Sequence, residues 1–104
     1  IGMNNRLAYC TSKGAINQMT KQMAIEWAPY HINVNAIAPS YIDTELTHHL
    51  FEQPDFYQFI MNNTPLKKIL NPDDLFGALL FLSSSASDMV TGHILLVDGG
   101  WVAQ

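Results

Sequence analysis

Two short apolar segments, far apart in the chain, constrain the fold more than any other feature of the sequence. Residues 32–38 alternate and then become continuously apolar before Pro39, and residues 93–97 form a second apolar run. Both patterns predict buried strands. The chain between them has helical patterns, and strands joined by helical crossovers pair in parallel, which predicts an α/β fold. Because two strands do not make a self-sufficient sheet, we expect the sheet to be incomplete here, with its missing neighbours ahead of Ile1.

A long helix is expected from Leu7 to about Trp27. Apolar residues recur there at three- and four-residue steps with polar residues between them, the pattern of a helix with one apolar face. Pro29 would stop this helix. We expect Met19 and Met23 to serve packing. The apolar positions are Ala8, Ala15, Ile16, Met19, Met23, Ala24 and Trp27.

Three shorter helices are predicted between the two strands. Residues 45–51 and 55–62 form two helical stretches broken by Pro54, and their aromatic side chains suggest a face that packs on apolar groups. A further helix is expected over residues 72–84. Asn71 is a good N-cap for it, and a proline and two acidic residues follow in its first turn.

Composition excludes several classes of function. The 104 residues suffice for one small domain. The net charge is −4 and no basic patch stands out, so we expect no nucleic-acid partner. The longest apolar run, residues 75–82, is too short to span a bilayer, so no membrane partner is expected either. The single cysteine, Cys10, cannot form an internal disulfide and fits a reducing cytoplasm. A start at Ile1 rather than Met suggests a piece of a longer protein.

Tyr9 and Lys13 are the candidate catalytic pair. Four residues apart at the start of a helix, they stack a phenol and an ammonium on one face. A neighbouring ammonium makes a phenolate easier to form, which suits a proton-transfer catalyst working near neutral pH. The alternative is an ordinary exposed pair on a helix surface, because this spacing also recurs by chance.

Other polar positions have structural interpretations. Residues 40–44 form a loop at the carboxyl end of the first strand, where open α/β sheets bind ligands. Asn35 is expected to hold backbone groups in place, and residues 98–100 to form a tight turn. Cys10 is expected to be a small packing residue. No metal site is expected, because metal-ligand spacing is absent among the histidines His31, His48, His49 and His93.

Four segments together resemble the C-terminal part of a short-chain dehydrogenase/reductase. They are Tyr9-x-x-x-Lys13, the run from Asn35 through Pro39 to Thr44, the segment from Pro65 to Asp74, and the ending from Thr91 to Gly100. The resemblance implies that residues 1–104 are the C-terminal fragment of a single NAD(P)-binding Rossmann-like domain, namely the C-terminal half of a parallel sheet flanked by helices. Residues 75–82 and 98–101 are similar to gluconate 5-dehydrogenase-like members.

The resemblance implies hydride transfer between NAD or NADP and an alcohol/ketone pair, with a small-molecule substrate such as a sugar acid. Tyr9 would be the general acid/base, and Lys13 would bind the nicotinamide ribose hydroxyls. Pro39 would shape the turn beside the cofactor, Ile42 would offer backbone groups to the carboxamide, and Thr44 a hydroxyl. The competing interpretation of Thr44 is a cap for the next helix. The aromatic residues from Phe51 to Phe59 would line a substrate pocket or pack in a core.

The sequence also departs from the family pattern. Ser40 stands where many members have glycine, and residues 66–71 replace a glycine-rich segment. The glycine-rich phosphate loop, the residue that separates NAD from NADP, and a catalytic Ser and Asn precede this segment in the family. We therefore expect the isolated chain to be inactive. Family members imply a homodimer or homotetramer, and a non-catalytic packing or oligomerisation module is the alternative function.

Overall fold

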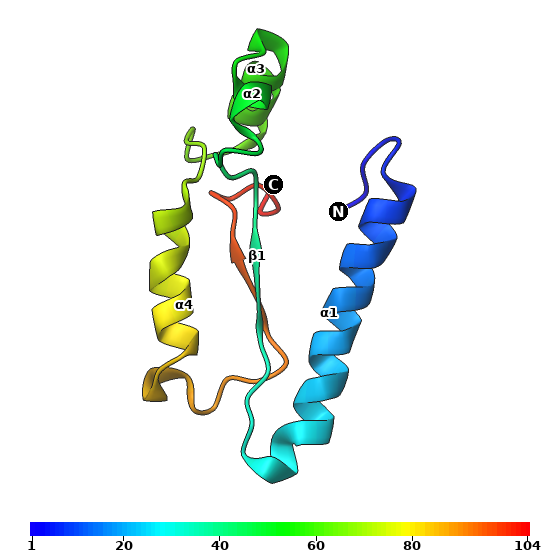
Figure 1. Ribbon diagram of the computed structural model, residues 1–104, viewed down its shortest axis with the longest axis vertical. Coiled ribbons are helices and arrows are strands. Elements are labelled where there is room, and N and C mark those ends of the chain that lie inside the picture. The colour runs from blue at the N-terminus through cyan, green and yellow to red at the C-terminus, as the bar shows by residue number, and fades with distance from the viewer. The chain divides into compact units, whose positions relative to one another are not determined.

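The computed structural model describes residues 1–104, in which helices precede the first strand and connect it to the second (Figure 1). The two strands pair with each other in a two-stranded parallel sheet, which confirms the predicted α/β fold. None of the helices has the length and apolar character needed to cross a lipid bilayer. In chain order the elements are α1 Leu7–Trp27, η1 Ala28–Tyr30, β1 Ala36–Pro39, α2 His48–Phe51, α3 Pro54–Asn63, η2 Pro72–Leu75, α4 Phe76–Leu82, η3 Ser85–Ser87 and β2 Ile94–Val97.

The first strand is shorter than the sequence predicts. The apolar pattern begins at residue 32, but β1 begins at Ala36, whose N–H donates to the carbonyl of His93 at 2.9 Å. Upstream of it, the N–H of Val34 donates to the Thr91 hydroxyl at 3.0 Å rather than to a strand carbonyl. Val34 still accepts a backbone bond from the N–H of Gly92 at 2.7 Å, but the side-chain bonds around it interrupt the regular ladder, which is why alternation alone misplaced the start of the strand.

Asn35 ties the two strands together where they begin. Its side-chain N–H donates to the carbonyl of Val90 at 2.8 Å, and its side-chain oxygen accepts from the N–H of His93 at 3.0 Å. Asn33 makes a similar bond to the carbonyl of Asp88 at 3.0 Å. An amide side chain offers both a donor and an acceptor, so Asn35 adds side-chain bonds between Ala36 and the backbone bond from the N–H of Gly92 to the carbonyl of Val34 at 2.7 Å. Its predicted role of holding backbone groups is confirmed.

The helix α1 has the predicted bounds but not the predicted packing. It runs from Leu7 to Trp27, yet only Thr20 and Ala24 on it are buried. Of the two methionines expected to serve packing, Met19 is 53% exposed and Met23 is partly exposed, so neither is buried by these 104 residues. The close contact of α1 is instead made by its small residues: a Cβ built on Gly92 would lie 3.4 Å from the Cβ of Ala24.

The aromatic residues of α2 and α3 pack with one another. Phe51 and Phe56 lie 5.9 Å apart between ring centroids, and Tyr41 meets the edge of Phe56 at 5.5 Å. Trp101, close to the C-terminus, lies 5.4 Å from Tyr41 and 5.7 Å from Phe59. Such edge and tilted contacts are the preferred geometry of aromatic pairs. These residues therefore pack on one another without being buried in a core, since Phe51 and Phe56 are half-buried and Phe59 is 43% exposed.

The helix after Asn71 begins as predicted, with a different first turn. The Asn71 side chain accepts from the N–H of Asp73 at 3.0 Å, and Asp74 accepts from the N–H of Asn71 at 2.9 Å, a reciprocal capping box. The first turn is the 3₁₀ helix η2, and α4 ends at Leu82 rather than near residue 84. Hydrogen bonds from Lys68 and from the Asn71 backbone lower the pKa of the Asp74 carboxyl.

The chain turns sharply after β2, as the sequence predicts. Asp98 accepts through both oxygens, from the N–H of Gly100 at 2.9 Å and of Val102 at 3.0 Å. Gly99 has a φ of +63°, and its carbonyl accepts from the N–H of Leu66 at 3.1 Å. A Cβ at Gly99 would lie 2.7 Å from the side chain of the buried Thr64, so this corner has no room for any larger residue.

We expect Gly99→Ala to lower the free energy of unfolding by about 2–4 kcal/mol, from a left-handed backbone and a collision with Thr64. The control is Gly77→Ala on α4, where no atom lies within 4 Å of the new Cβ. That change should raise stability by up to about 1 kcal/mol through helix propensity. Urea denaturation measures both, and equal midpoints for Gly99→Ala and the unsubstituted protein would contradict the packing argument.

Candidate active site

The predicted phenol and ammonium meet at the start of α1. Lys13 Nζ lies over the ring of Tyr9, 5.6 Å from its centroid, within the range of a cation–π contact. Tyr9 is 57% exposed. Neither of the two ion pairs in the structure involves Lys13, so its charge is not compensated by a carboxylate. The arrangement therefore places an available ammonium beside an accessible phenol.

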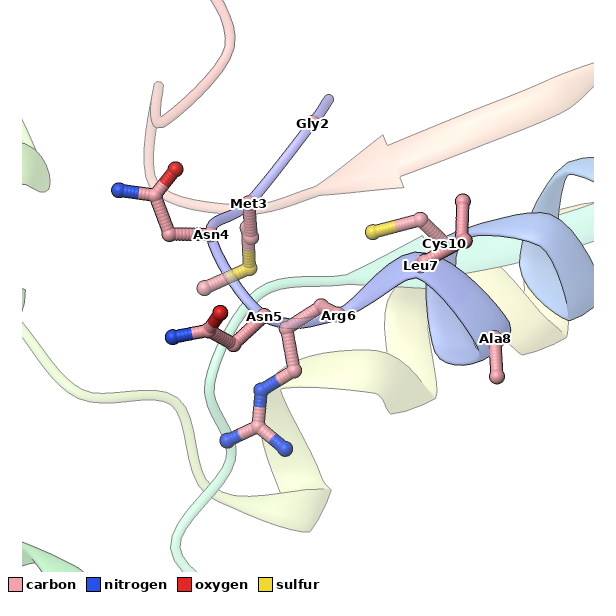
Figure 2. Close-up of a pocket in the computed structure, with 8 residues that line it drawn as sticks. All are labelled: Gly2, Met3, Asn4, Asn5, Arg6, Leu7, Ala8 and Cys10. Carbon is pink, nitrogen blue, oxygen red and sulfur yellow. The ribbon is translucent and has the colours of Figure 1, made fainter.

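A hollow of about 780 Å³ lies beside this first turn (Figure 2). Residues 2–8 and Cys10 line it, and neither Tyr9 nor Lys13 is among them. The Cys10 sulfur points toward the N-terminal loop and lies 3.8 Å from the carbonyl of Ile1. Two asparagine amides and the guanidinium of Arg6 supply polar groups to its wall. The hollow adjoins the candidate pair in sequence without containing it.

The loop after β1 carries the other candidate residues. Pro39 is the last residue of β1, and the N–H of Ser40 donates to the carbonyl of Val97 at 3.2 Å, so pairing continues past the proline. Ile42 then forms an isolated parallel bridge with Leu70. In this bridge, Tyr41 and Asp43 make the bonds to Leu70, so the N–H and C=O of Ile42 point to the opposite side. The backbone N–H of Ile42 therefore points away from Leu70, its partner in the bridge.

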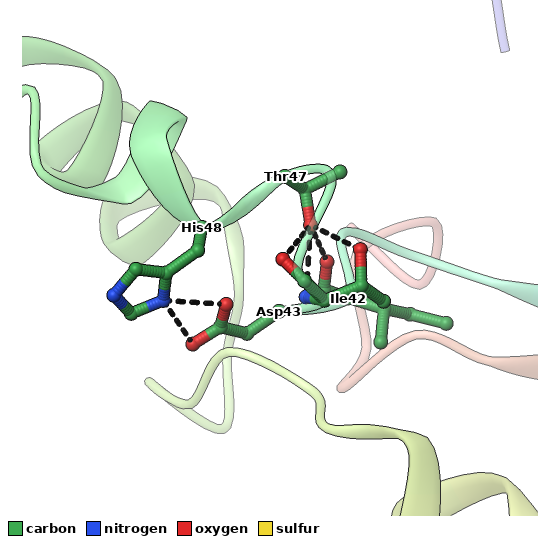
Figure 3. A network of polar contacts seen from close by, with 5 residues as sticks. Ile42, Asp43, Thr47 and His48 are labelled. Carbon is green, nitrogen blue, oxygen red and sulfur yellow. Dashed lines mark hydrogen bonds and ion pairs between the residues drawn. The ribbon is translucent and has the colours of Figure 1, made fainter.

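Thr47 organises this loop (Figure 3). Its hydroxyl donates to the carbonyl of Ile42 at 2.6 Å and accepts from the N–H of Thr44 at 3.0 Å. The Thr44 hydroxyl lies 2.9 Å from the same oxygen. The residue before α2 is Thr47, and Thr44 contributes only its carbonyl to the first turn, accepting from the N–H of His48 at 2.8 Å. The alternative in which the Thr44 side chain caps α2 is wrong.

An ion pair closes the outer side of the loop. His48 Nδ1 lies 2.9 Å and 3.2 Å from the two carboxylate oxygens of Asp43 (Figure 3). The hydrogen bond to Asp43, together with its negative charge, raises the pKa of His48. Sequence reasoning assigned no specific partner to His48 and did not single out Asp43 or Thr47. The predicted helix over residues 45–51 contained Thr47, and the threonine directly before it is Thr44, so no sequence signal pointed to Thr47.

The candidate residues fall into two groups, each described within its own part of the chain. Tyr9 and Lys13 belong to a unit formed by residues 1–37 and 81–95. Pro39, Ile42 and Thr44 belong to a unit formed by residues 38–80 and 96–104. No group of three His, Cys, Asp or Glu side chains has the arrangement of a metal site.

Comparison with known proteins identifies the family. A family profile described as enoyl-(acyl carrier protein) reductase matches residues 1–102. The 2-dehydro-3-deoxy-D-gluconate 5-dehydrogenase of Formosa agariphila is 46% identical over 104 residues, covering 99% of this chain and 39% of that protein. The chain belongs to the short-chain dehydrogenase/reductase family. A second member, the 5-keto-D-gluconate 5-reductase of Escherichia coli, is 44% identical over 100 residues, covering 96% of this chain and 39% of that protein.

Solved structures of family members superpose closely on the chain. A gluconate 5-dehydrogenase from Burkholderia cenocepacia, in complex with NADP and tartrate, has a TM-score of 0.88 at 41% identity and covers 92% of this chain. A 4-hydroxyisoleucine dehydrogenase complexed with NADH has a TM-score of 0.95 at 36% identity and covers the whole chain. This chain covers 38% and 43% of those two proteins. It therefore corresponds to less than half of the length of these members.

We expect Thr47→Val to loosen the loop at a single, measurable amide. The N–H of Thr44 loses its hydroxyl acceptor, so its hydrogen exchange should accelerate about two- to tenfold, the equivalent of one net hydrogen bond. Thr47→Ser keeps the hydroxyl and should retain the slow rate. Exchange followed by NMR at the Thr44 amide decides this, and equal rates in the valine and serine variants would contradict the role given to Thr47.

Proposed function

We propose that residues 1–104 are the C-terminal part of a single dinucleotide-binding domain. The protein that contains them would interconvert an alcohol and a ketone with NAD or NADP. The observation that carries the proposal is the uncompensated Lys13 ammonium, 5.6 Å from the ring centroid of an exposed tyrosine, in a chain of this family. The chain spans only 39% of the length of its sugar-acid relatives, which supports a partner half that supplies the remaining contacts.

Each of the two groups of candidate residues, taken by itself, offers groups that suit the nicotinamide end of such a cofactor. Lys13 is a cation with three donors, and no carboxylate engages it, so it is available for ribose hydroxyls. The N–H of Ile42 points away from Leu70, and Thr44 adds an exposed hydroxyl; both suit an amide group. Pro39 fixes the backbone where the strand leads into this loop. When bound, the dinucleotide supplies the hydride acceptor or donor.

Tyr9 would move the proton in this reaction. In alcohol oxidation its phenolate oxygen accepts the hydroxyl proton as the carbon loses hydride, and in ketone reduction the phenol returns that proton. Lys13 stabilises the phenolate by its positive charge, because an opposite charge nearby favours the ionised form. The two side chains are catalytic residues in this proposal, and Lys13 also binds the cofactor.

The substrate class proposed is a small sugar acid. Relatives at 44% and 46% identity are named for 5-keto-D-gluconate and 2-dehydro-3-deoxy-D-gluconate. The free thiol of Cys10 fits a protein of the reducing cytoplasm.

A packing or oligomerisation role is the second candidate function, and it is compatible with the first. The helix α4 exposes large apolar side chains, with Leu79 at 55% and Leu80 at 57%. Exposed apolar side chains on one short helix suit a contact site. We accordingly propose a homodimer or homotetramer for the full-length protein.

Tyr9→Phe in the full-length protein should lower kcat by about 10²–10⁴-fold, the contribution of a positioned acid/base group. Cofactor affinity should stay unchanged, since the ring and Lys13 remain. Tyr30→Phe is the matched control, an exposed tyrosine in η1, and should keep full activity. Steady-state kinetics and cofactor titration measure both quantities. Retained turnover in Tyr9→Phe would refute the catalytic role.

The isolated 104-residue chain should show no dehydrogenase activity with sugar acids and either nicotinamide cofactor. It lacks any glycine-rich phosphate loop, so the dinucleotide would be held at its nicotinamide end alone. Reduced-nicotinamide absorbance, with the full-length protein as positive control, tests this. Turnover by the isolated chain above the level of its Tyr9→Phe variant would overturn the division of the site between two halves.

A further inference from the structure

The side chains of Asp43, Thr47 and His48 hold the loop that follows β1, and we call these three side chains the latch. Asp43 lies between Ile42 and Thr44 in sequence, and its carboxylate bonds His48, the first residue of α2. The Thr47 hydroxyl donates to the carbonyl of Ile42 and accepts from the N–H of Thr44, the two residues on either side of Asp43. Two consecutive residues of one helical turn therefore hold three consecutive residues of the loop (Figure 3). The three loop residues include the two to which we assigned cofactor contacts.

The charges around His48 are predominantly negative. Asp43 acts on it directly, and Glu52 at the end of α2 adds a weaker attraction; both raise the pKa of His48. The other segment packed against the latch carries Leu70, whose carbonyl accepts from the N–H of Asp43 at 2.8 Å. The cations of that segment are engaged elsewhere: Lys67 donates to the carbonyl of Met61, and Lys68 pairs with Asp74.

We propose that His48 is a positioning residue that, through Asp43, fixes the loop between Ile42 and Thr44 for the dinucleotide. The inference rests on the proposed function. A loop held in place before binding loses less conformational freedom when the cofactor docks, so the latch strengthens cofactor binding. Once the cofactor is bound the loop is ordered in either case, and the chemical step at Tyr9 is unaffected. The latch therefore acts on the KM for cofactor and leaves kcat unchanged.

The pH dependence of the latch has a definite sign. Because the folded state raises the pKa of His48 above its ordinary value of 6.5, the charge-assisted bond is fully present below that value. It weakens as the pH rises through the higher folded pKa. A neutral imidazole still donates from Nδ1, so the contact weakens rather than breaks. Both groups are partly exposed, which limits the effect on cofactor KM to about two- to fivefold.

The test compares four forms of the full-length enzyme for the KM for NAD and NADP across the histidine titration range, up to about pH 8. The unsubstituted enzyme should show a KM that rises about two- to fivefold. His48→Leu should have the higher KM at every pH. His48→Asn, whose amide N–H takes the place of Nδ1 but carries no charge and does not titrate, should have at every pH the KM that the unsubstituted enzyme reaches at high pH. His49→Gln, at the adjacent exposed histidine, should behave like the unsubstituted enzyme.

A second measurement reads the latch without turnover. NMR titration of the imidazoles should give His48 a pKa above 6.5, and Asp43→Asn should lower it. If His48→Leu turns over normally and has an unchanged KM for cofactor, the role given to the latch is wrong. The proposed function then still stands. The role given to the latch is also wrong if His48→Leu lowers kcat and leaves the KM for cofactor constant. An unsubstituted protein that neither binds nor reduces a nicotinamide cofactor would overturn the proposed function and the latch with it.

Discussion

The pairing of β1 with β2, extended by Asn35, is the constraint on which the remaining structure depends. Its backbone and side-chain bonds set the register of two strands that are separated by most of the chain. That register fixes where each strand ends, and both polar features of interest begin at those ends. β1 leads into the loop that Thr47 organises, and β2 leads into the corner at Gly99. A slip of one residue would reverse which face each side chain occupies and would dismantle both.

Few buried apolar side chains within these residues stabilise the register of the two strands. Among hydrophobic residues only Ala24, Ile60 and Leu70 are buried, and α1 exposes most of its apolar stripe. A parallel sheet in α/β proteins is covered on both faces, so apolar helix surfaces of this kind fit the proposal of a larger domain around these strands.

Local signals predicted the fold well wherever a single residue type decides the backbone. Pro29 ended the first helical pattern near the observed Trp27, and Asn71 formed the cap its side chain suggests. The start of β1 was misplaced because Asn33 and Asn35 satisfy backbone groups that alternation assigns to a ladder. The i,i+4 spacing of a helix sufficed to predict that the side chains of Tyr9 and Lys13 meet. The Asp43–His48 pair was not predictable, since a five-residue separation brings two side chains together only in a loop of one particular shape.

Lys13 illustrates how one side chain can serve two requirements. An ammonium that is already paired with a carboxylate would offer Tyr9 little net charge, because the partner's field opposes its own. Here the ammonium lies over the face of the ring, where the aromatic quadrupole attracts it, and makes no ion pair. That attraction holds the charge near the phenol while leaving its N–H donors available. Under the proposed function, Lys13 therefore lies beside Tyr9 and keeps its N–H donors for ribose hydroxyls, which a salt-bridged lysine would not do.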